Sequence, residues 1–99
     1  MTHYIRQVIK SFRHAGLEKF FKTGSKAGIQ PPHADKLQLQ LETLDRAKQP
    51  LDMNAAAWRL HPLKGDRAGQ WSVKVNANWR MIFAFDGEDA VLVDYDDYH

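Results

Sequence analysis

The chain has 99 residues, which suits one small domain, and its hydrophobic fraction of 43% is typical of a globular protein. It has no cysteine, so disulfides, thiolate catalysis and cysteine-ligated zinc are excluded. Residues 1–10 contain Arg6 and Lys10 and no apolar run long enough for a signal peptide or a membrane span. We therefore expect a soluble, cytoplasmic protein with no membrane partner.

The formal net charge is only +2, but it is unevenly distributed. Residues 1–86 hold all 14 Lys and Arg against seven of the 12 acids, a balance of +7, whereas residues 87–99 hold the other five acids and no base, a balance of −5. A basic body favours polyanionic partners through counterion release. A lysine-rich solvated surface would give the same balance, so charge alone does not decide between the two interpretations.

The first half of the chain is predicted to be mainly helical. Residues 4–12 alternate well enough for a strand. Residues 14–22 have apolar side chains at helical spacing and predict a short amphipathic helix, after which two glycines interrupt the pattern. Residues 31–48 predict a longer helix, which begins with two prolines in its first turn and is ended by Pro50. One loose turn is expected at residues 51–57.

The second half is predicted to be an antiparallel meander, because apolar and polar residues alternate along it. The turn-rich segment 64–69, Asn76-Ala77-Asn78 and Asp86-Gly87 are expected to connect its strands. Helices followed by strands indicate an α+β fold, with two N-terminal helices packed on a mainly antiparallel sheet of about five strands. The strands of this half are expected at residues 57–63, 71–75, 79–85 and 90–95.

His61 is a candidate for proton transfer, because it lies near the end of a predicted strand and histidine is the side chain whose unperturbed pKa lies closest to neutral pH. Lys64 and Arg67 follow in the adjoining turn, where their charges suit a phosphodiester. The competing interpretation is a histidine that caps a strand beside a solvated basic turn. Arg80 lies on the strand face opposite Trp79, which is either a concave basic surface or the exposed side of an edge strand.

The segment Asp96-Asp97-Tyr98-His99 also carries chemistry. Tyr98 suits stacking on a nucleic-acid base, Asp97 suits proton acceptance, and His99 can accept or donate a proton. Two other interpretations compete with this one. Two Asp and one His can contribute to a metal site if other ligands complete it, and an acidic tail can simply be disordered.

Three segments carry a family resemblance: WRLHPLKGDRAGQWSV at residues 58–73, NWRMIF at 78–83 and DYDDYH at 94–99. They resemble the HigB-type toxins of the RelE/ParE toxin–antitoxin superfamily, and VIKSFRHAGL at residues 8–17 resembles the usual start of that family. Residues 1–7 precede this start, so they are either an N-terminal extension of the first strand or the product of an over-long gene prediction.

The resemblance implies a single toxin domain over residues 1–99 with a RelE-like fold of the microbial-ribonuclease type. Members of the family are toxins of bacterial type II systems that cleave mRNA in the ribosomal A site without a metal or another cofactor. The implied partners are the ribosome, mRNA and a cognate helix-turn-helix antitoxin of the HigA type, which alone contacts operator DNA.

The resemblance also implies roles for seven residues of this sequence. His61, Asp97, His99 and Arg80 would be catalytic, the first three in proton transfer and Arg80 as a transition-state clamp. Lys64, Arg67 and Tyr98 would bind substrate. The alternative is a non-catalytic toxin of the ParE type that inhibits DNA gyrase, or an inert relative kept as a binding module. A gyrase inhibitor needs no acid–base residues, so this set favours the ribonuclease.

Overall fold

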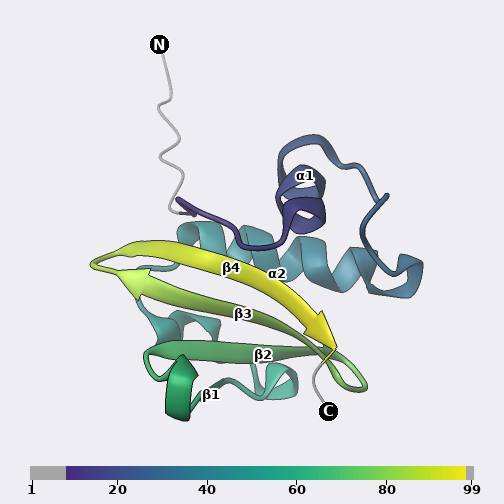
Figure 1. Cartoon of the computed structure of the whole chain (residues 1–99). Helices are drawn as coiled ribbons and strands as arrows, with labels where there is room; N and C mark the ends of the chain where they lie inside the picture. The colour runs from purple at the N-terminus through teal and green to yellow at the C-terminus, as the bar shows by residue number, and fades with distance from the viewer. Residues whose placement is uncertain (1–8, 98–99) are drawn as a thin grey trace.

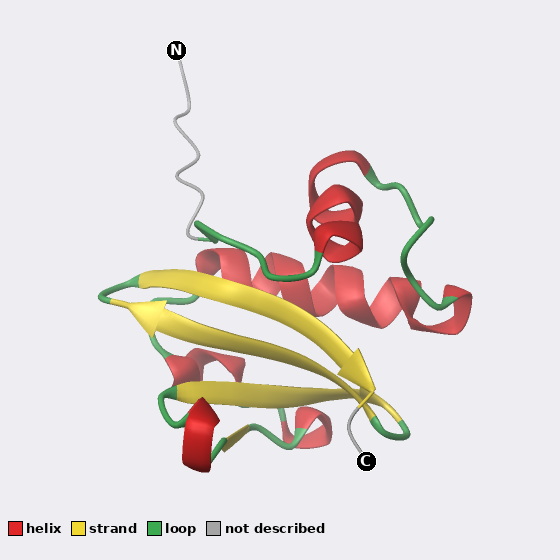
Figure 2. Cartoon of the chain, viewed as in Figure 1, coloured by secondary structure: helices red, strands yellow, loops and turns green. Residues whose placement is uncertain are grey.

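A computed structural model describes residues 9–97 (Figure 1). Helices α1 (Ala15–Thr23) and α2 (Ala34–Arg46) lie on one face of a four-stranded sheet, as Figure 2 shows. This arrangement confirms the predicted α+β class, although the sheet has four strands where about five were expected. No helix within residues 9–97 is long and apolar enough to cross a membrane. Most of the predicted strand 4–12 and all of residues 1–7 lie outside the described residues.

Helix α1 forms where the apolar spacing predicts it. His14 caps its N-terminus, because the Nδ1 atom accepts a hydrogen bond of 2.9 Å from the backbone N–H of Leu17. Gly24 ends the helix with a φ of 81°, a left-handed conformation that glycine adopts without steric cost. The side chains of Leu17 and Phe20 are buried against the rest of the molecule. The predicted helix over residues 14–22 is thereby confirmed.

Helix α2 buries one leucine stripe against the sheet, and Leu37, Leu41 and Leu44 each expose no more than 1% of their surface. The two prolines stand in a preceding 3₁₀ turn, Pro31–His33, rather than in the first α-helical turn. A proline lacks the N–H that an interior helical position would require, so the turn before the helix accommodates both. The prediction for residues 31–48 is correct for the body of the helix, which ends at Arg46.

The sheet is a meander in the order β1-β2-β3-β4, with every neighbouring pair antiparallel. Consecutive strands are joined by short connections, as the alternation and the turn residues predicted. The hairpin turns after β2 and β3 place Ala77 at φ 50° and Gly87 at φ 65°. The strand bounds are β1 (His61–Pro62), β2 (Gln70–Asn76), β3 (Trp79–Asp86) and β4 (Asp89–Asp97).

The predicted strand over residues 57–63 is mostly wrong. Only His61–Pro62 pairs with β2, and Ala56–Trp58 forms a 3₁₀ turn. The indole of Trp58 is buried in the core, and Arg59 follows it with a φ of 50°, which interrupts an extended strand. The loose turn expected at residues 51–57 is replaced by two 3₁₀ turns, Pro50–Met53 and Ala56–Trp58.

The edge of β4 that does not pair with β3 is covered by the start of the described chain. Ile9 and Phe12 form isolated parallel bridges with Ala90 and Val93. Between these bridges, β4 contains an extra residue: Leu92 has a φ of 57°, and the pairing with β3 shifts by one position there. Such a shift is a β-bulge, which bends a strand and changes the facing of the residues that follow it.

The two faces of the sheet differ in character. Val73, Val75, Met81 and Phe83 pack with α2 in the main hydrophobic core. We call the other side, which does not carry α1 and α2, the outer face. The turn η4 (Gly65–Arg67) lies over the outer face, since its last residue contacts a β4 side chain there.

Candidate active site

Two rows of side chains cross the outer face. Residues directly opposite each other in antiparallel strands project to the same face, so the strand register defines these rows. The first row is His61, Ser72, Ile82 and Asp94; the second row is Lys74, Arg80 and Asp96. The second row brings two cations and one carboxylate together at the end of the sheet where β3 begins and β4 ends.

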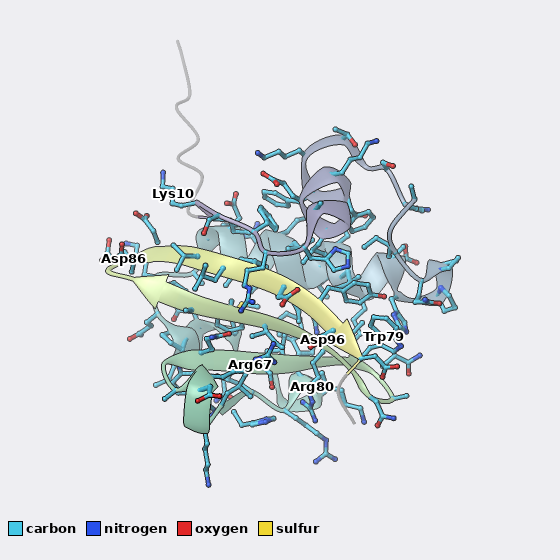
Figure 3. All side chains as sticks on the ribbon, viewed as in Figure 1. Lys10, Arg67, Trp79, Arg80, Asp86 and Asp96 are labelled. Carbon is cyan, nitrogen blue, oxygen red and sulfur yellow. The ribbon has the colours of Figure 1, made fainter. Side chains whose placement is uncertain are left out.

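Arg67 joins the second row from the loop between β1 and β2. Its Nη2 atom lies 3.7 Å from the Oδ2 atom of Asp96, and the two side chains are 30% and 45% exposed. Figure 3 shows Arg67, Arg80 and Asp96 gathered over the same part of the outer face. The predicted substrate residue Arg67 and the predicted catalytic residue Arg80 are thus neighbours in space.

Arg80 is held with an unsatisfied donor. Its Nη1 atom is buried and makes no hydrogen bond to the part of the chain that the structure describes. A guanidinium has donors only, and leaving a charged donor without an acceptor costs free energy. This donor therefore needs an acceptor from outside the described residues.

His61 is oriented by its own backbone. The Nδ1 atom lies 3.2 Å from the carbonyl oxygen of Arg59, and the Nε2 atom lies 3.5 Å from the hydroxyl of the fully buried Ser72. A carbonyl oxygen only accepts, so this contact assigns the proton of the neutral ring to Nδ1. The lone pair of the imidazole is then on Nε2, on the side that faces β2.

The remaining predicted residues are placed less centrally. Lys64 is exposed and precedes the η4 turn as its N-cap residue. Asp97 is the last residue of β4 and is exposed; its register partner is Trp79, so it lies on the opposite face from Asp96. Tyr98 and His99 lie outside the described residues. The structure therefore brings three of the predicted residues, His61, Arg67 and Arg80, to one face.

Sequence reasoning gave no role in the site to three residues of this face. Ser72 and Lys74 were recognised only as the polar side of a half-buried strand, and Asp96 was included in the chemistry-bearing tail without a role of its own. The register places Lys74 opposite Arg80 and Asp96 opposite Arg80 on its other side. Regular pairing continued from Asn76 and Trp79 would place Lys74 opposite Met81. A register shift between Lys74 and Asn76 pairs Lys74 with Arg80 instead, and no pattern in the sequence signals this shift.

Behind the second row, a buried aromatic cluster supports the ends of β3 and β4. The Nδ1 atom of His33 lies 2.6 Å from the hydroxyl of Tyr95, which also accepts a hydrogen bond of 3.3 Å from the backbone N–H of Gln30. The rings of Trp79 and Tyr95 are 4.6 Å apart between centroids. Tyr95 is therefore fixed by contacts from three directions.

The titration of this cluster is shifted by burial. Burial lowers the pKa of His33, because the charged imidazolium is less well solvated there. Burial raises the pKa of Tyr95, and the N–H of Gln30 partly offsets this by stabilising the phenolate. Both rings are thus favoured in their neutral forms, and the tautomer of His33 sets whether Nδ1 or the Tyr95 hydroxyl donates in the hydrogen bond between them.

The outer face combines cations with one oriented imidazole. Cations hold a phosphodiester and stabilise charge that develops on it, and an imidazole transfers protons near neutral pH. Within residues 9–97, no three or more His, Asp and Glu side chains are grouped so that they could hold a metal ion. The arrangement suits acid–base chemistry on a phosphate ester.

Comparison with known proteins agrees with this chemistry. Residues 10–99 match the family of HigB-like toxins, described as RelE-like toxins of the type II toxin–antitoxin system HigB. Endoribonuclease HigB of Proteus vulgaris is 42% identical over 92 residues, which represent 93% of this chain and all of that protein. The matched range spans the positions of all seven residues predicted for the site. The chain therefore belongs to the HigB-like family of RelE-like toxins, and its partner is the antitoxin of a type II system.

Proposed function

We propose that this HigB-family toxin is an endoribonuclease that cleaves mRNA in the ribosomal A site and so stops translation. The observation that carries the proposal is the outer face, where the imidazole of His61 lies on the same side of the sheet as Arg67 and Arg80. The relative from Proteus vulgaris, which is named an endoribonuclease, supports this reading over a gyrase inhibitor of the ParE type.

The reaction uses the nucleophile that RNA itself carries. A base removes the proton of the ribose 2′-hydroxyl, and the oxygen attacks the adjacent phosphorus. The bond to the 5′-oxygen breaks as an acid protonates that oxygen, which leaves a 2′,3′-cyclic phosphate and a free 5′-hydroxyl. This sequence consumes no cofactor and needs one base, one acid and donors for the negative phosphorane.

In this proposal, His61, Asp97 and His99 share the two proton transfers. His61 is prepared for a proton-accepting role, since its contact with the Arg59 carbonyl directs the lone pair to Nε2. Asp97 ends β4 directly after Asp96 of the second row, and its register position faces the other side of the sheet. Tyr98 stacks on a base of the message.

The cations hold the phosphate in this proposal. A non-bridging phosphate oxygen is the acceptor for Arg80, whose buried Nη1 has none among the described residues. Lys64 is exposed at the start of η4 and meets the RNA backbone from the loop side. A donor aimed at charge that develops in the transition state contributes about 10²–10³ in rate.

The ribosome supplies the positioning that a small protein lacks. A message held in the A site reaches the toxin already oriented, which removes much of the entropic barrier. We infer that the toxin acts in the cytoplasm on translating ribosomes. Its antitoxin is of the helix-turn-helix HigA type, and contact with operator DNA occurs only through that antitoxin.

Sequencing of mRNA 5′ ends after induction of the toxin alone tests the proposal. We expect growth arrest and new 5′ ends within translated frames, and both should be lost in His61→Ala and after deletion of His99. Arg80→Gln should slow cleavage on programmed ribosomes by about 10²–10³. Arg46→Gln removes the same charge from the exposed end of α2 and should remain toxic. Intact mRNA together with stalled replication would favour gyrase inhibition instead.

A further inference from the structure

We propose that Asp96 is an internal substitute for the RNA phosphate. In the free protein its carboxylate occupies the anion position beside Arg67, and an incoming phosphodiester displaces it. The inference rests on the proposed function, because it assumes that RNA binds the outer face. In this proposal Asp96 opposes RNA binding, whereas Arg67, Arg80 and Lys74 on the same face favour it.

The position of Asp96 supports this role. Its register partner on β3 is Arg80, whose own partner on β2 is Lys74. Arg67 reaches the same carboxylate from the η4 turn. Asp96 therefore contacts Arg67 and lies opposite Arg80, with Lys74 one strand further away in the same row.

The Arg67–Asp96 contact is loose enough to be exchanged. Its closest N–O distance is 3.7 Å, well beyond the roughly 2.7–2.9 Å of a charge-assisted hydrogen bond. Both side chains keep contact with solvent, and exposed ion pairs contribute little to stability. A ligand that offers a better acceptor can therefore separate the two residues without unfolding the loop.

Asp96 also leaves the site incomplete. Although it is directly opposite Arg80, the buried Nη1 of Arg80 has no acceptor among the described residues. The Asp96 carboxylate is attached to β4 and contacts Arg67, which belongs to the η4 turn. A phosphodiester is not tied to the sheet, and its two non-bridging oxygens can accept from Arg67 and Arg80 together. We expect this freedom of the phosphodiester to favour its binding over the contact between Asp96 and Arg67.

Asp96 as a support for Arg67 is the competing role. A supporting carboxylate would hold the guanidinium in its binding position, so its removal would weaken binding. An internal competitor would have to be displaced, so its removal would strengthen binding. The two roles predict opposite signs for the same substitution.

The test measures binding of a single-stranded RNA oligonucleotide whose 2′-hydroxyls are methylated, so that it cannot be cleaved. Fluorescence anisotropy across a salt series compares wild type with Asp96→Asn, which keeps the shape and removes the charge. We expect Asp96→Asn to bind about two- to fivefold more tightly, the range set by a partly exposed ion pair. In an Arg67→Gln background this gain should disappear, because the cation that Asp96 occupies is gone.

Asp94→Asn is the matched control. Asp94 lies two residues earlier on the same strand, opposite Ile82 on the same face, and its Oδ1 atom accepts from the N–H of Tyr95. The substitution removes the same charge without touching the Arg67 contact. Salt screens its longer-range influence, so at physiological salt we expect an affinity change below about twofold.

Three results would overturn the inference: weaker or unchanged binding by Asp96→Asn, an equal gain in Asp94→Asn, or a gain that persists with Arg67→Gln. Each of these leaves the proposed function standing if wild type binds the oligonucleotide and Arg80→Gln does not. Loss of all binding by wild type and Asp96→Asn, even at the lowest salt, would instead reject the outer face as an RNA site.

Discussion

Tyr95→Phe is expected to destabilise the protein substantially although it removes a single oxygen atom. The hydroxyl forms a hydrogen bond of 2.6 Å with the Nδ1 of His33 and accepts one of 3.3 Å from the N–H of Gln30. Phenylalanine keeps the ring and its contacts with Trp79. The lost free energy therefore reports the hydrogen bonds alone.

The magnitude follows from what the substitution leaves behind. His33 is 5% exposed, so its Nδ1 becomes a buried polar atom without this partner, which costs about 1–3 kcal/mol. Gln30 is exposed, so its N–H can turn to water and adds little. A total of about 1–3 kcal/mol is a large share of the roughly 5–15 kcal/mol that stabilises a domain. The midpoint of thermal unfolding should fall by about 4–8 °C for each kcal/mol.

Urea unfolding at pH 7.5, followed by tryptophan fluorescence, measures the change in the free energy of unfolding. A double-mutant cycle with His33→Leu provides the control, because Tyr95→Phe then leaves no buried nitrogen unpaired and should cost less than about 0.5 kcal/mol. A cost below about 0.5 kcal/mol for Tyr95→Phe in the wild-type background would refute the reasoning. So would an equal cost in both backgrounds.

Two further predictions concern stability. Because burial lowers the pKa of His33 in the folded state, its contribution is complete above the unfolded pKa of about 6.5 and falls as the pH drops from there toward the folded value. Urea titrations between pH 7.5 and 5 should therefore show a steeper loss of stability for wild type than for His33→Gln, and parallel curves would contradict this. Leu92→Gly should cost less than about 1 kcal/mol in thermal unfolding, since glycine relieves the positive φ of 57° at a residue that is 41% exposed. A larger loss would show that the leucine side chain, and not the backbone, matters at the bulge.

The helices and the last three strands were predictable because their periodicity is regular. Leu37, Leu41 and Leu44 share one helical face, and the alternate apolar residues Val73, Val75, Met81 and Phe83 of β2 and β3 share the core face. Local conformations at turns were less predictable. The turn at Asn76-Ala77-Asn78 forms where expected, but Ala77 takes the positive φ although asparagine tolerates it better.

The first predicted strand of the β half failed for a tertiary reason. The alternation of apolar and polar residues over 57–63 is compatible with a strand. In the structure, however, the indole of Trp58 is buried in the core from a 3₁₀ turn at Ala56–Trp58. Propensity and pattern describe a segment by itself, and packing against the core overrides them.

The candidate site was predictable only in part. Strand alternation predicts that Arg80 and Trp79 face opposite sides of the sheet, and the structure confirms this. The contact between Arg67 and Asp96 depends on how the 64–69 loop folds back over the sheet. No periodicity in the sequence predicts the path of this loop, so the contact between Arg67 and Asp96 could not be predicted from the sequence. The roles of the seven residues remain predictions.

The extra residue at Leu92 determines on which side of the sheet the acidic end of β4 acts. Before it, Ala90 faces the core; after it, Val93 and Tyr95 do, so the phase of alternation is inverted. An unbroken strand would turn Tyr95 outward and drive two carboxylates, Asp94 and Asp96, into the apolar layer under the helices. The inserted residue thus sets which side chains of β4 face the core. Tyr95 packs inward, whereas its two neighbours, Asp94 and Asp96, project from the outer face.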